Sequence, residues 1–412
     1  MKLHITVPAL NEEASIERTI RRCLDARSYI ISHSPVSDVE ITVVSDGSTD
    51  RTVEIARPFE GQINLIVFPK NRGYGAAIKE GWMHSDADLL AFMDADGTCD
   101  PRFFANLCRA LSENTADIVL GGRLNSDSKM PLIRRIGNTL FALLLSAFSR
   151  RSIRDTASGM RVVRRTALPQ LFPLPDGLHF TPAMTARCLM SGDLKLCEID
   201  MSYEEREGKS KLRVGKDGLR FLKSILDMAF LYEPWRPLGV AAAVSLAVAA
   251  SLMVTPTIHY VRHRSLEEWM IYRFIVSHLA GTNAVLMLSA AYITGRIARI
   301  ALFRKPRANV LERLLGRPSF GLIPLGSMIV GGLLVLPSFL QLVRTGSIYE
   351  HWSRFIAMSF LFSAALILLT TWAMNYVLEL LSDQLRYLRS LRQTPLEDSG
   401  AMTDERTVSR NT

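Results

Sequence analysis

The sequence has 412 residues, 48% of them apolar, and a formal net charge of +9 at pH 7. That length exceeds one ordinary domain, and a mean hydropathy of +0.14 is high for a wholly soluble protein. The excess of positive charge fits nucleic acid, an anionic membrane surface or anionic substrates, so the placement of the basic residues has to decide among them. The five cysteines form no CxxC pair, which argues against a zinc module and predicts free thiols in a reducing compartment.

Up to about residue 235, short apolar runs alternate with amphipathic stretches. The pattern predicts strands at 3–7, 40–45, 64–68 and 89–93, and helices near 12–26, 50–57 and 74–84. Such alternation is typical of an α/β sandwich with a mainly parallel sheet. The first residues contain no apolar stretch long enough for a signal peptide, so we expect this half of the chain to be a cytoplasmic head.

Polar clusters follow three of the predicted strands, in VPALNEE (7–13), VVSDGSTD (43–50) and AFMDADGT (91–98). In the last cluster Asp94 and Asp96 are two residues apart and can share one face of the strand end. Two carboxylates at the carboxyl end of a parallel strand suit Mg²⁺ or Mn²⁺, with diphosphate oxygens completing the coordination shell. Turn and helix-cap chemistry explains any one cluster equally well. Three clusters at one sheet edge favour a nucleotide site.

Further along, the chain carries a glycine-rich turn and scattered basic residues. The turn NRGYGAA (71–77) opens a predicted helix whose free amides could approach a donor phosphate. Arg and Lys beside Gly and Ser then occur in GGR (121–123), the pair Arg134 and Arg135, DTASGMR (155–161) and EEREGKSKL (204–212). These residue types suit phosphate binding, although a solvated surface charge explains any single arginine.

Beyond residue 235 the composition changes to long apolar segments. Four of them, at 238–258, 271–294, 320–343 and 355–378, are long enough to cross a bilayer as helices. The loop at 295–318 carries seven basic residues against one acid, which places it on the cytoplasmic side. An even number of spans keeps the head on that side too. We therefore predict an integral, multi-pass protein of the inner or plasma membrane.

Two stretches of the head, 130–149 and 215–232, mix basic residues with Leu, Phe and Ile. Either can lie in the membrane interface, or can pack on the sheet as an ordinary amphipathic helix. The predicted organisation is a head at 1–235 with interfacial helices, a four-helix membrane domain at 236–380, and a polar, disordered tail at 381–412.

Taken in order, VPALNEE, VVSDGSTD, NRGYGAA, MDADGT, GGR, DTASGMR and REGKSKL resemble the motif series of glycosyltransferase family two over about residues 1–230. The most similar subgroup contains the dolichol-phosphate mannose synthases and bacterial polyprenyl-phosphate glycosyltransferases. The resemblance implies a GT-A fold, a nucleotide-sugar donor held by Mg²⁺ or Mn²⁺, and inversion at the anomeric carbon. It also implies a polyprenyl phosphate lipid as the acceptor.

Carried over residue by residue, the resemblance implies a catalytic set of Asp94, Asp96, Arg123 and Arg161, of which Asp94 and Asp96 hold the metal. The nucleotide-sugar-binding residues that it implies are Pro8, Leu10, Glu12, Ser45, Asp46, Asn71, Gly75, Asp94 and Ala95. The acceptor-phosphate-binding residues that it implies are Arg135, Ser158, Arg206, Ser210 and Lys211.

The sequence also departs from the subgroup. Leu10 replaces a common Tyr, Ser45 a common Asp, and Thr98 a Gln that often helps to bind metal, so the base and the sugar stay open. His179 lies in LHFTPAM, where mannose synthases have acidic residues. We expect it to be structural or to contact sugar, because an acceptor phosphate, with a second pKa of ~6, is already an anionic nucleophile at neutral pH.

Other functions remain open on the sequence. A lipid or glycan hydroxyl acceptor would require a base such as His179. A processive polysaccharide synthase would carry Gln-x-x-Arg-Trp, whereas this chain has Glu-Pro-Trp-Arg at 233–236. A non-catalytic scaffold or transporter disagrees with the intact acidic motif, and a nucleic-acid binder disagrees with basic residues that follow the membrane edges. The sequence leaves the sugar, nucleotide, lipid length, consuming pathway and a homo-oligomer undecided.

Overall fold

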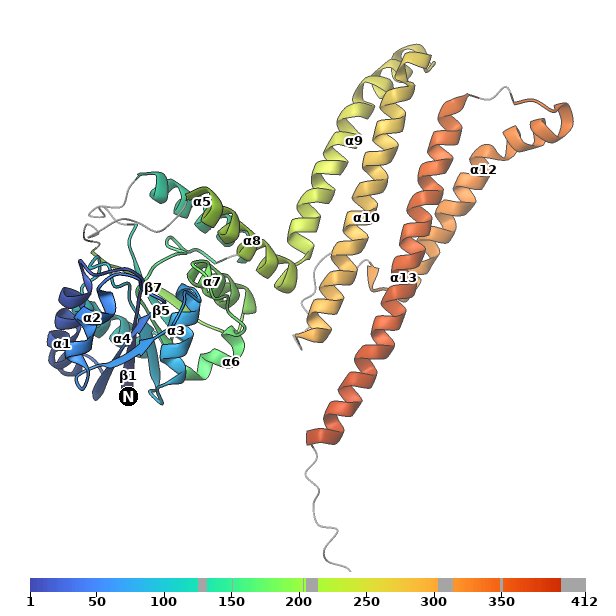
Figure 1. Ribbon diagram of the computed structural model, residues 1–412. Helices are drawn as coiled ribbons and strands as arrows, with labels where there is room; N and C mark the ends of the chain where they lie inside the picture. Colours follow the sequence, from blue (N-terminus) through green and yellow to red (C-terminus); the bar gives the residue numbers. More distant parts are fainter. Residues whose placement is uncertain are drawn as a thin grey trace, which may run out of the picture. The chain divides into compact units, whose positions relative to one another are not determined.

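The computed structural model describes residues 1–124, 132–149, 151–202, 204, 214–302, 313, 315–348 and 351–393. The chain divides into two compact units, Met1–Glu233 and Pro234–Thr412. The first unit contains a β-sheet with helices around it, and the second contains long helices (Figure 1).

The first unit is built on a seven-stranded sheet in the order β3-β2-β1-β4-β6-β5-β7. The strands are β1 (Lys2–Ala9), β2 (Asp38–Ser45), β3 (Asn64–Val67), β4 (Leu89–Phe92), β5 (Ile118–Gly122), β6 (Arg161–Arg164) and β7 (Leu196–Asp200). β6 pairs antiparallel with β4 and β5, whereas the other neighbouring pairs are parallel. The predicted α/β head with a mainly parallel sheet is confirmed.

Helices cover both faces of this sheet. They are α1 (Ile16–His33), α2 (Thr52–Ala56), α3 (Tyr74–Met83), α4 (Phe104–Glu113), α5 (Leu132–Ser149), α6 (Leu168–Leu171), α7 (Phe180–Ser191) and α8 (Val214–Tyr232). One core joins Leu3, Ile5 and Val7 of β1 to α1 and α4. A second core joins β4 to α3 and α7 on the other face. With both faces covered, even His4 and Thr6, the polar residues of β1 that alternate with its apolar ones, are fully buried.

The start of α1 differs from its prediction by four residues. A helix is predicted from residue 12, but α1 begins at Ile16. Residues 12–15 form a turn in which the Glu12 carbonyl accepts the amides of Ser15 (3.0 Å) and Ile16 (2.9 Å). The turn lets the segment after β1 contact the segment after β2 before the helix starts, which matters for the site.

In the described residues, the second unit contains four long apolar helices: α9 (Trp235–His263), α10 (Ile271–Ala301), α12 (Leu322–Thr345) and α13 (Trp352–Gln393). Each has a segment long and apolar enough to cross a membrane, so the prediction of four such helices is confirmed. α13 continues to Gln393, which corrects the expectation of a disordered tail from 381, because its Leu and Tyr residues extend the helical pattern. Residues 394–412 lie outside the described ranges.

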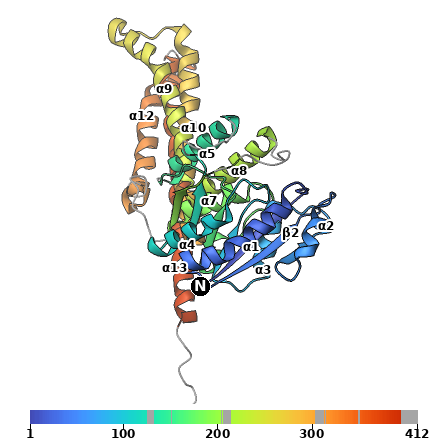
Figure 2. The ribbon, with the colours of Figure 1, turned by 90° about the vertical axis from the view of Figure 1, so that its left-hand side faces the viewer.

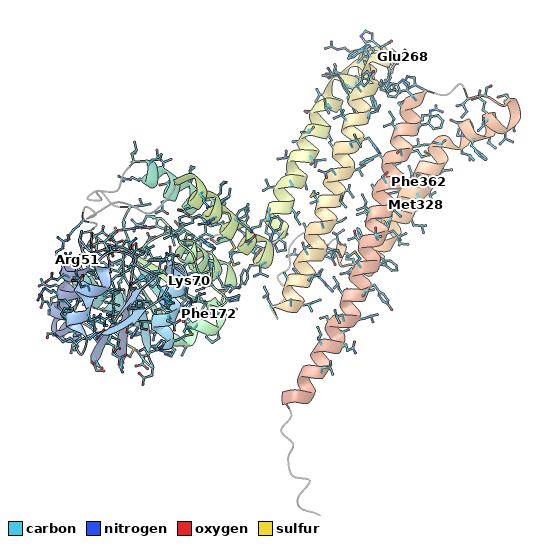
Figure 3. The ribbon with its side chains drawn as sticks, viewed as in Figure 1. Arg51, Lys70, Phe172, Glu268, Met328 and Phe362 are labelled. Carbon is cyan, nitrogen blue, oxygen red and sulfur yellow. The ribbon has the colours of Figure 1, made fainter. Side chains whose placement is uncertain are left out.

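Within the second unit, α10 packs against α9 and α13, and α12 packs against α13 (Figure 2). Small residues permit close approach: a Cβ added at Gly331 of α12 would lie 2.9 Å from the ring of Phe362 on α13 (Figure 3). Polar contacts also join α10 to α13. The Tyr292 hydroxyl donates to Asn375 Oδ1 (2.7 Å), and Asn375 donates to Glu379 (3.1 Å).

Candidate active site

The sheet brings the three predicted polar clusters to one edge. Parallel pairing places Ala9 beside Ser45 and Thr6 beside Phe92. The segments that leave β1, β2 and β4 therefore start next to one another at the carboxyl ends of parallel strands, where open α/β sheets bind ligands. Pro8 and Ser45 are buried within β1 and β2, and Leu10 is half-buried just after β1.

The segments after β1 and β2 are joined by hydrogen bonds, and we call residues 10–15 and 46–52 the paired loops. Asn11, with φ +49°, donates its amide to Ser48 Oγ (3.1 Å) and accepts the Thr49 amide at Oδ1 (2.7 Å). Three further bonds are Glu12 N to Thr52 Oγ1 (2.8 Å), Glu13 N to Asp50 Oδ2 (3.1 Å) and Arg51 N to Glu13 Oε2 (3.2 Å). These hydrogen bonds hold the paired loops in one arrangement at the carboxyl edge of the sheet.

Asp46, which follows β2, is buried and accepts backbone amides. Its carboxylate takes the Arg72 amide at Oδ1 (2.6 Å) and the Gly73 amide at Oδ2 (2.9 Å). Burial raises the pKa of Asp46, although both hydrogen bonds and the charge of Arg72 oppose that shift. Asp46 therefore joins the glycine-rich turn to the sheet edge.

The glycine-rich turn at 71–77 packs against the backbone at Pro175 and Asp176. The Gly75 and Ala76 amides donate to the Asp176 carbonyl (2.6 and 3.1 Å). A Cβ at Gly75 would lie 2.3 Å from the Pro175 carbonyl oxygen, so only glycine fits there. The expectation of free amides pointing at a donor is therefore corrected at Gly75, whose amide is bonded inside the fold. Asn71 is exposed beside it.

Asp94 and Asp96 follow β4, and each carboxylate has a defined partner. The Tyr74 hydroxyl donates to Asp94 Oδ1 (2.6 Å). Burial raises the pKa of Tyr74 well above 10, so the hydroxyl stays a donor. Asp96, almost fully buried, accepts the hydroxyl (2.7 Å) and the amide (3.2 Å) of Thr98 at Oδ1. Thr98 thus holds the carboxylate that the sequence assigned to a metal.

The backbone between the two aspartates is fixed by α1. The Ala95 carbonyl accepts the hydroxyls of Ser15 (2.8 Å) and Thr19 (3.1 Å). On the other side lies Gly159, where an added Cβ would be 2.0 Å from Asp94 Oδ2. The loop at 155–160 therefore lies directly against the acidic motif, which sequence spacing did not reveal.

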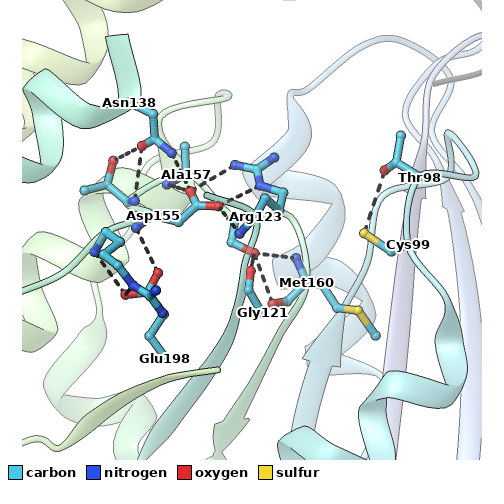
Figure 4. Close-up of polar contacts among 12 residues, drawn as sticks. Thr98, Cys99, Gly121, Arg123, Asn138, Asp155, Ala157, Met160 and Glu198 are labelled. Atoms are coloured by element: carbon cyan, nitrogen blue, oxygen red, sulfur yellow. Dashed lines mark hydrogen bonds and ion pairs between the residues drawn. The ribbon is translucent and has the colours of Figure 1, made fainter. Parts of the chain in front are cut away.

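Arg123 is held by Asp155, a residue that the sequence analysis did not select (Figure 4). Arg123 donates from Nε (2.7 Å) and a terminal nitrogen (3.0 Å), and its amide donates too (3.1 Å). Asn138 of α5 adds a bond to Asp155 Oδ1 (2.7 Å). Burial by itself raises the pKa of Asp155, but the charge and hydrogen bonds of Arg123 lower it to about 2. The acid that opens the motif DTASGMR was the available signal.

Arg161, which was predicted to be catalytic, and Ser158, which was predicted to bind the acceptor phosphate, are both buried and bonded within the fold. Arg161 is fully buried and donates to Ser158 O (3.0 Å), Thr185 Oγ1 (2.7 Å) and Thr156 O (2.9 Å). Ser158 is fully buried too, and its hydroxyl donates to the Gly121 carbonyl (2.6 Å). Burial lowers the pKa of Arg161 to about 10. Both side chains are shielded from solvent, and their hydrogen bonds hold the loop at 155–160 in place.

The predicted acceptor residues are only partly described. Arg135 is exposed on α5. Arg206, Ser210 and Lys211 lie outside the described residues. Glu12 is half-buried within the paired loops.

His179 precedes α7 at its N-terminus. Its Nδ1 is buried without a hydrogen-bond partner among the described residues. Burial lowers the pKa of His179, and nearby Arg220 acts in the same direction. Burial therefore favours the neutral form of the ring, which fits a structural or sugar-contacting role and the general-base alternative equally.

The donor set suits a divalent metal that binds together with a diphosphate. Among the described residues, no three His, Cys, Asp or Glu side chains converge into a complete metal site. The acidic motif offers at most the carboxylates of Asp94 and Asp96, so other oxygens would complete the shell. Mg²⁺ and Mn²⁺ accept such mixed shells of carboxylate, water and phosphate oxygens.

Comparison with known proteins places this site in a family. Residues 4–172 match the model for glycosyl transferase family 2. The chain is 31% identical over 256 residues to the low-salt glycan biosynthesis hexosyltransferase Agl6 of Haloferax volcanii, covering 60% of each chain. It is 30% identical over 241 residues to the dolichyl-phosphate beta-glucosyltransferase of Drosophila melanogaster, covering 53% of this chain and 73% of that one.

A third relative aligns over more of the chain. The dodecaprenyl-phosphate galacturonate synthase of Rhizobium johnstonii is 23% identical over 309 residues, covering 73% of this chain and 85% of that one. The chain spans only 60% of the length of Agl6. The family match, the relatives and the acidic motif at the carboxyl edge of a mainly parallel sheet agree, and the chain therefore belongs to glycosyl transferase family 2.

Proposed function

We propose that this protein is an inverting glycosyltransferase that moves a sugar from a nucleoside-diphosphate sugar to polyprenyl phosphate at the cytoplasmic face of a membrane. One observation carries the proposal. A fixed sheet edge presents Asp46, Asp94 and Asp96 in a chain that also has four helices long and apolar enough to cross a membrane. The names of two relatives, a dolichyl-phosphate and a dodecaprenyl-phosphate sugar transferase, support the lipid acceptor.

The donor is proposed to bind at the paired loops and the acidic motif. Pro8, Leu10, Glu12 and Asp46 would surround the nucleoside, and Asp94 and Asp96 would hold Mg²⁺ or Mn²⁺. The metal, when bound, neutralises negative charge on the nucleoside diphosphate that leaves. Tyr74 and Thr98 orient the two carboxylates through their hydrogen bonds (2.6 and 2.7 Å), so the ligands are positioned before the donor arrives.

The acceptor phosphate is proposed to attack directly. One of its oxygens forms a bond to the anomeric carbon while the bond from that carbon to the diphosphate oxygen breaks, which inverts the configuration. A phosphate monoester with a second pKa of ~6 is ionised at neutral pH and needs no protein base. Arg135, which is exposed, and the stretch at 206–211 supply positive charge suited to this phosphate.

The experiment is transfer from a panel of radiolabelled nucleotide sugars to undecaprenyl phosphate by the purified protein, with and without EDTA. We expect acid-labile label in the lipid phase that EDTA abolishes. Asp96→Ala should lose the activity because it removes a metal ligand, whereas Asp193→Ala, which changes an exposed carboxylate of the head, should keep it.

The same assay separates the alternatives. Label found on a lipid or glycan hydroxyl would mean that the acceptor is a hydroxyl and not a phosphate. His179 could then serve as the base for that hydroxyl. Absence of transfer with every donor, from a protein whose thermal unfolding stays cooperative, would contradict an enzymatic role and favour a scaffold.

A further inference from the structure

The outward side of α5 is a continuous apolar stripe. Within this helix five large apolar residues are each more than half exposed. They are Leu132, Ile133, Ile136, Leu140 and Leu143, and we call them the outer face of α5. Because successive residues are about 100° apart around an α-helix, these five lie within about 100° of arc. A contiguous exposed stripe of this kind marks a surface that something covers.

The opposite side of α5 reaches into the candidate site. Ala142 and Leu145 are buried in a core with residues of α7 and α8. Asn138, on the same side, is almost fully buried. Its amide nitrogen donates to Asp155 Oδ1 (2.7 Å), and its oxygen accepts the amide (3.2 Å) and the hydroxyl (2.8 Å) of Thr156. One helix thus connects an exposed apolar stripe to the carboxylate that holds Arg123 (Figure 4).

The neighbouring helix α8 indicates what covers the stripe. The rings of Phe141 on α5 and Phe221 on α8 lie edge to face, with centroids 5.9 Å apart. α8 also exposes apolar side chains beside basic ones, namely Leu219, Phe230, Leu231, Lys216, Arg220 and Lys223, against a single exposed acid in the described part of the helix, Asp227. Apolar residues flanked by Lys and Arg suit the headgroup region of an anionic bilayer.

Chain connectivity points the same way. α8 ends at Tyr232, and the first helix long and apolar enough to cross a membrane begins at Trp235. Only Glu233 and Pro234 separate them. A bilayer crossed by α9 is therefore within a few residues of α8 along the chain, and α8 packs directly on α5.

We propose that the outer face of α5 inserts into the interface of a lipid bilayer and that this contact, through Asn138, sets the position of the Asp155 carboxylate and hence of Arg123. The effect of this bilayer contact on catalysis depends on the proposed function, whereas the contact itself does not depend on it. A head in contact with the bilayer, where a lipid acceptor is found, therefore has a more rigidly held Arg123 cluster than the same head away from the membrane.

The first test measures where α5 lies in a bilayer. A spin label is attached at Leu140→Cys in the full chain with Cys197→Ser, reconstituted in lipid nanodiscs containing anionic lipid. Met83→Cys is the matched control, since Met83 is a similarly exposed apolar residue on α3. We expect the label at 140 to be relaxed by oxygen and shielded from a water-soluble nickel complex, and the label at 83 to show the reverse.

Three outcomes would overturn the membrane contact. Equal access of the nickel complex to both labels would leave the outer face in water. Shielding from both reagents would mean that another part of the same chain covers it. Spin–spin broadening that disappears on dilution with unlabelled protein would mean that a second copy covers it.

The second test measures the coupling to Asp155. Leu140→Ser with Leu143→Ser should raise amide hydrogen exchange of residues 154–160 several-fold in nanodiscs, whereas Met83→Ser should not. Unchanged exchange in the double variant, together with loss of the bilayer contact, would overturn the coupling. Neither measurement depends on sugar transfer, so both results could be interpreted even if the proposed function were wrong.

Discussion

Two buried arginines near the candidate site differ in what balances their charge. Arg123 has a full carboxylate partner in Asp155. Arg161 has three neutral oxygens from Ser158, Thr185 and Thr156. A buried cation without an adjacent anion costs free energy unless its donors are satisfied, and this site satisfies them with backbone carbonyls and a hydroxyl. The two residues therefore order the same loop by different means.

The buried ion pair gives a prediction at the residue scale. Asp155→Asn removes the anion while Arg123 stays largely buried, so we expect a loss of about 3–5 kcal/mol in the free energy of unfolding of the head. Asp200→Asn breaks the exposed pair with Arg154 and should cost less than ~1 kcal/mol. Urea unfolding in detergent, followed by near-ultraviolet circular dichroism, measures both. Equal midpoints for the two variants would contradict the prediction.

At this scale the sequence predicted residue types better than roles. Asp94 and Asp96 were identifiable because two acids follow an apolar strand at a spacing that shares a face. Arg161 was assigned to the catalytic set because a motif shows that an arginine is present and does not show whether it is buried. Asp155 was missed because its partner is 32 residues away in the chain, and only the fold brings the two together.

At the scale of elements, the loop at 155–160 packs on the acidic motif with no spare room. Gly159 lies where a Cβ would be 2.0 Å from Asp94 Oδ2 and 2.5 Å from its Cγ. Tyr74 already fixes the other oxygen of that carboxylate. The carboxylate is therefore confined between a hydroxyl and a backbone, and its position depends on the loop as much as on β4.

A methyl group at that position tests the confinement. Gly159→Ala should displace Asp94 and lower sugar transfer about 100-fold, since a misplacement of about 1 Å in a catalytic group has that effect. Electron paramagnetic resonance of Mn²⁺ with a nucleoside diphosphate should show weaker binding as well. Gly218→Ala is the matched control, because its nearest atom would be at 3.9 Å. Wild-type transfer and Mn²⁺ binding in Gly159→Ala would contradict the confinement.

The elements themselves were largely predictable. The periods of apolar residues located β1 to β4, the helices near them and the four long helices, because those patterns depend on local burial. The start of α1 was wrong because the turn at 12–15 bonds to residues after β2, which a periodic pattern does not contain. The end of α13 was wrong because the Leu residues that continue the helical pattern beyond 381 are interspersed with charged and polar residues, which reads as a tail.

At the scale of the whole molecule, a buried histidine gives the head a pH-dependent stability. His4 lies fully buried in β1, with Nδ1 3.5 Å from Glu40 Oε2. Burial lowers its pKa to about 4; the charge of Glu40 opposes that shift, and the nearby cations Arg165 and Lys2 add to it. Because the unfolded chain, with a His pKa near 6.5, binds the proton first, stability falls as pH decreases from 6.5 towards 4.

The expected size of this effect is on the order of 3 kcal/mol between those pH values. His4→Val removes the titrating group. The slope of the thermal midpoint against pH in this window should therefore become shallower, even if the substitution also shifts the midpoint itself. His33→Gln, at an exposed position on α1, should leave the slope unchanged. Intrinsic fluorescence of the purified protein measures the midpoint, and identical slopes in all three proteins would refute the role of His4.

The hydrogen bonds between the paired loops imply that two separate pieces of sequence have to be changed together. Each loop donates amides to oxygens of the other: the Thr49 amide donates to Asn11 Oδ1, and the Glu12 amide donates to Thr52 Oγ1. Replacing one loop alone by that of a relative would leave polar groups in the other loop without hydrogen-bond partners. Replacing both loops together would preserve the bonds between them. An experiment that transfers the preference for a nucleotide-sugar donor from one relative to another should therefore exchange residues 10–15 and 46–52 together. A single-residue insertion in either loop should be poorly tolerated for the same reason.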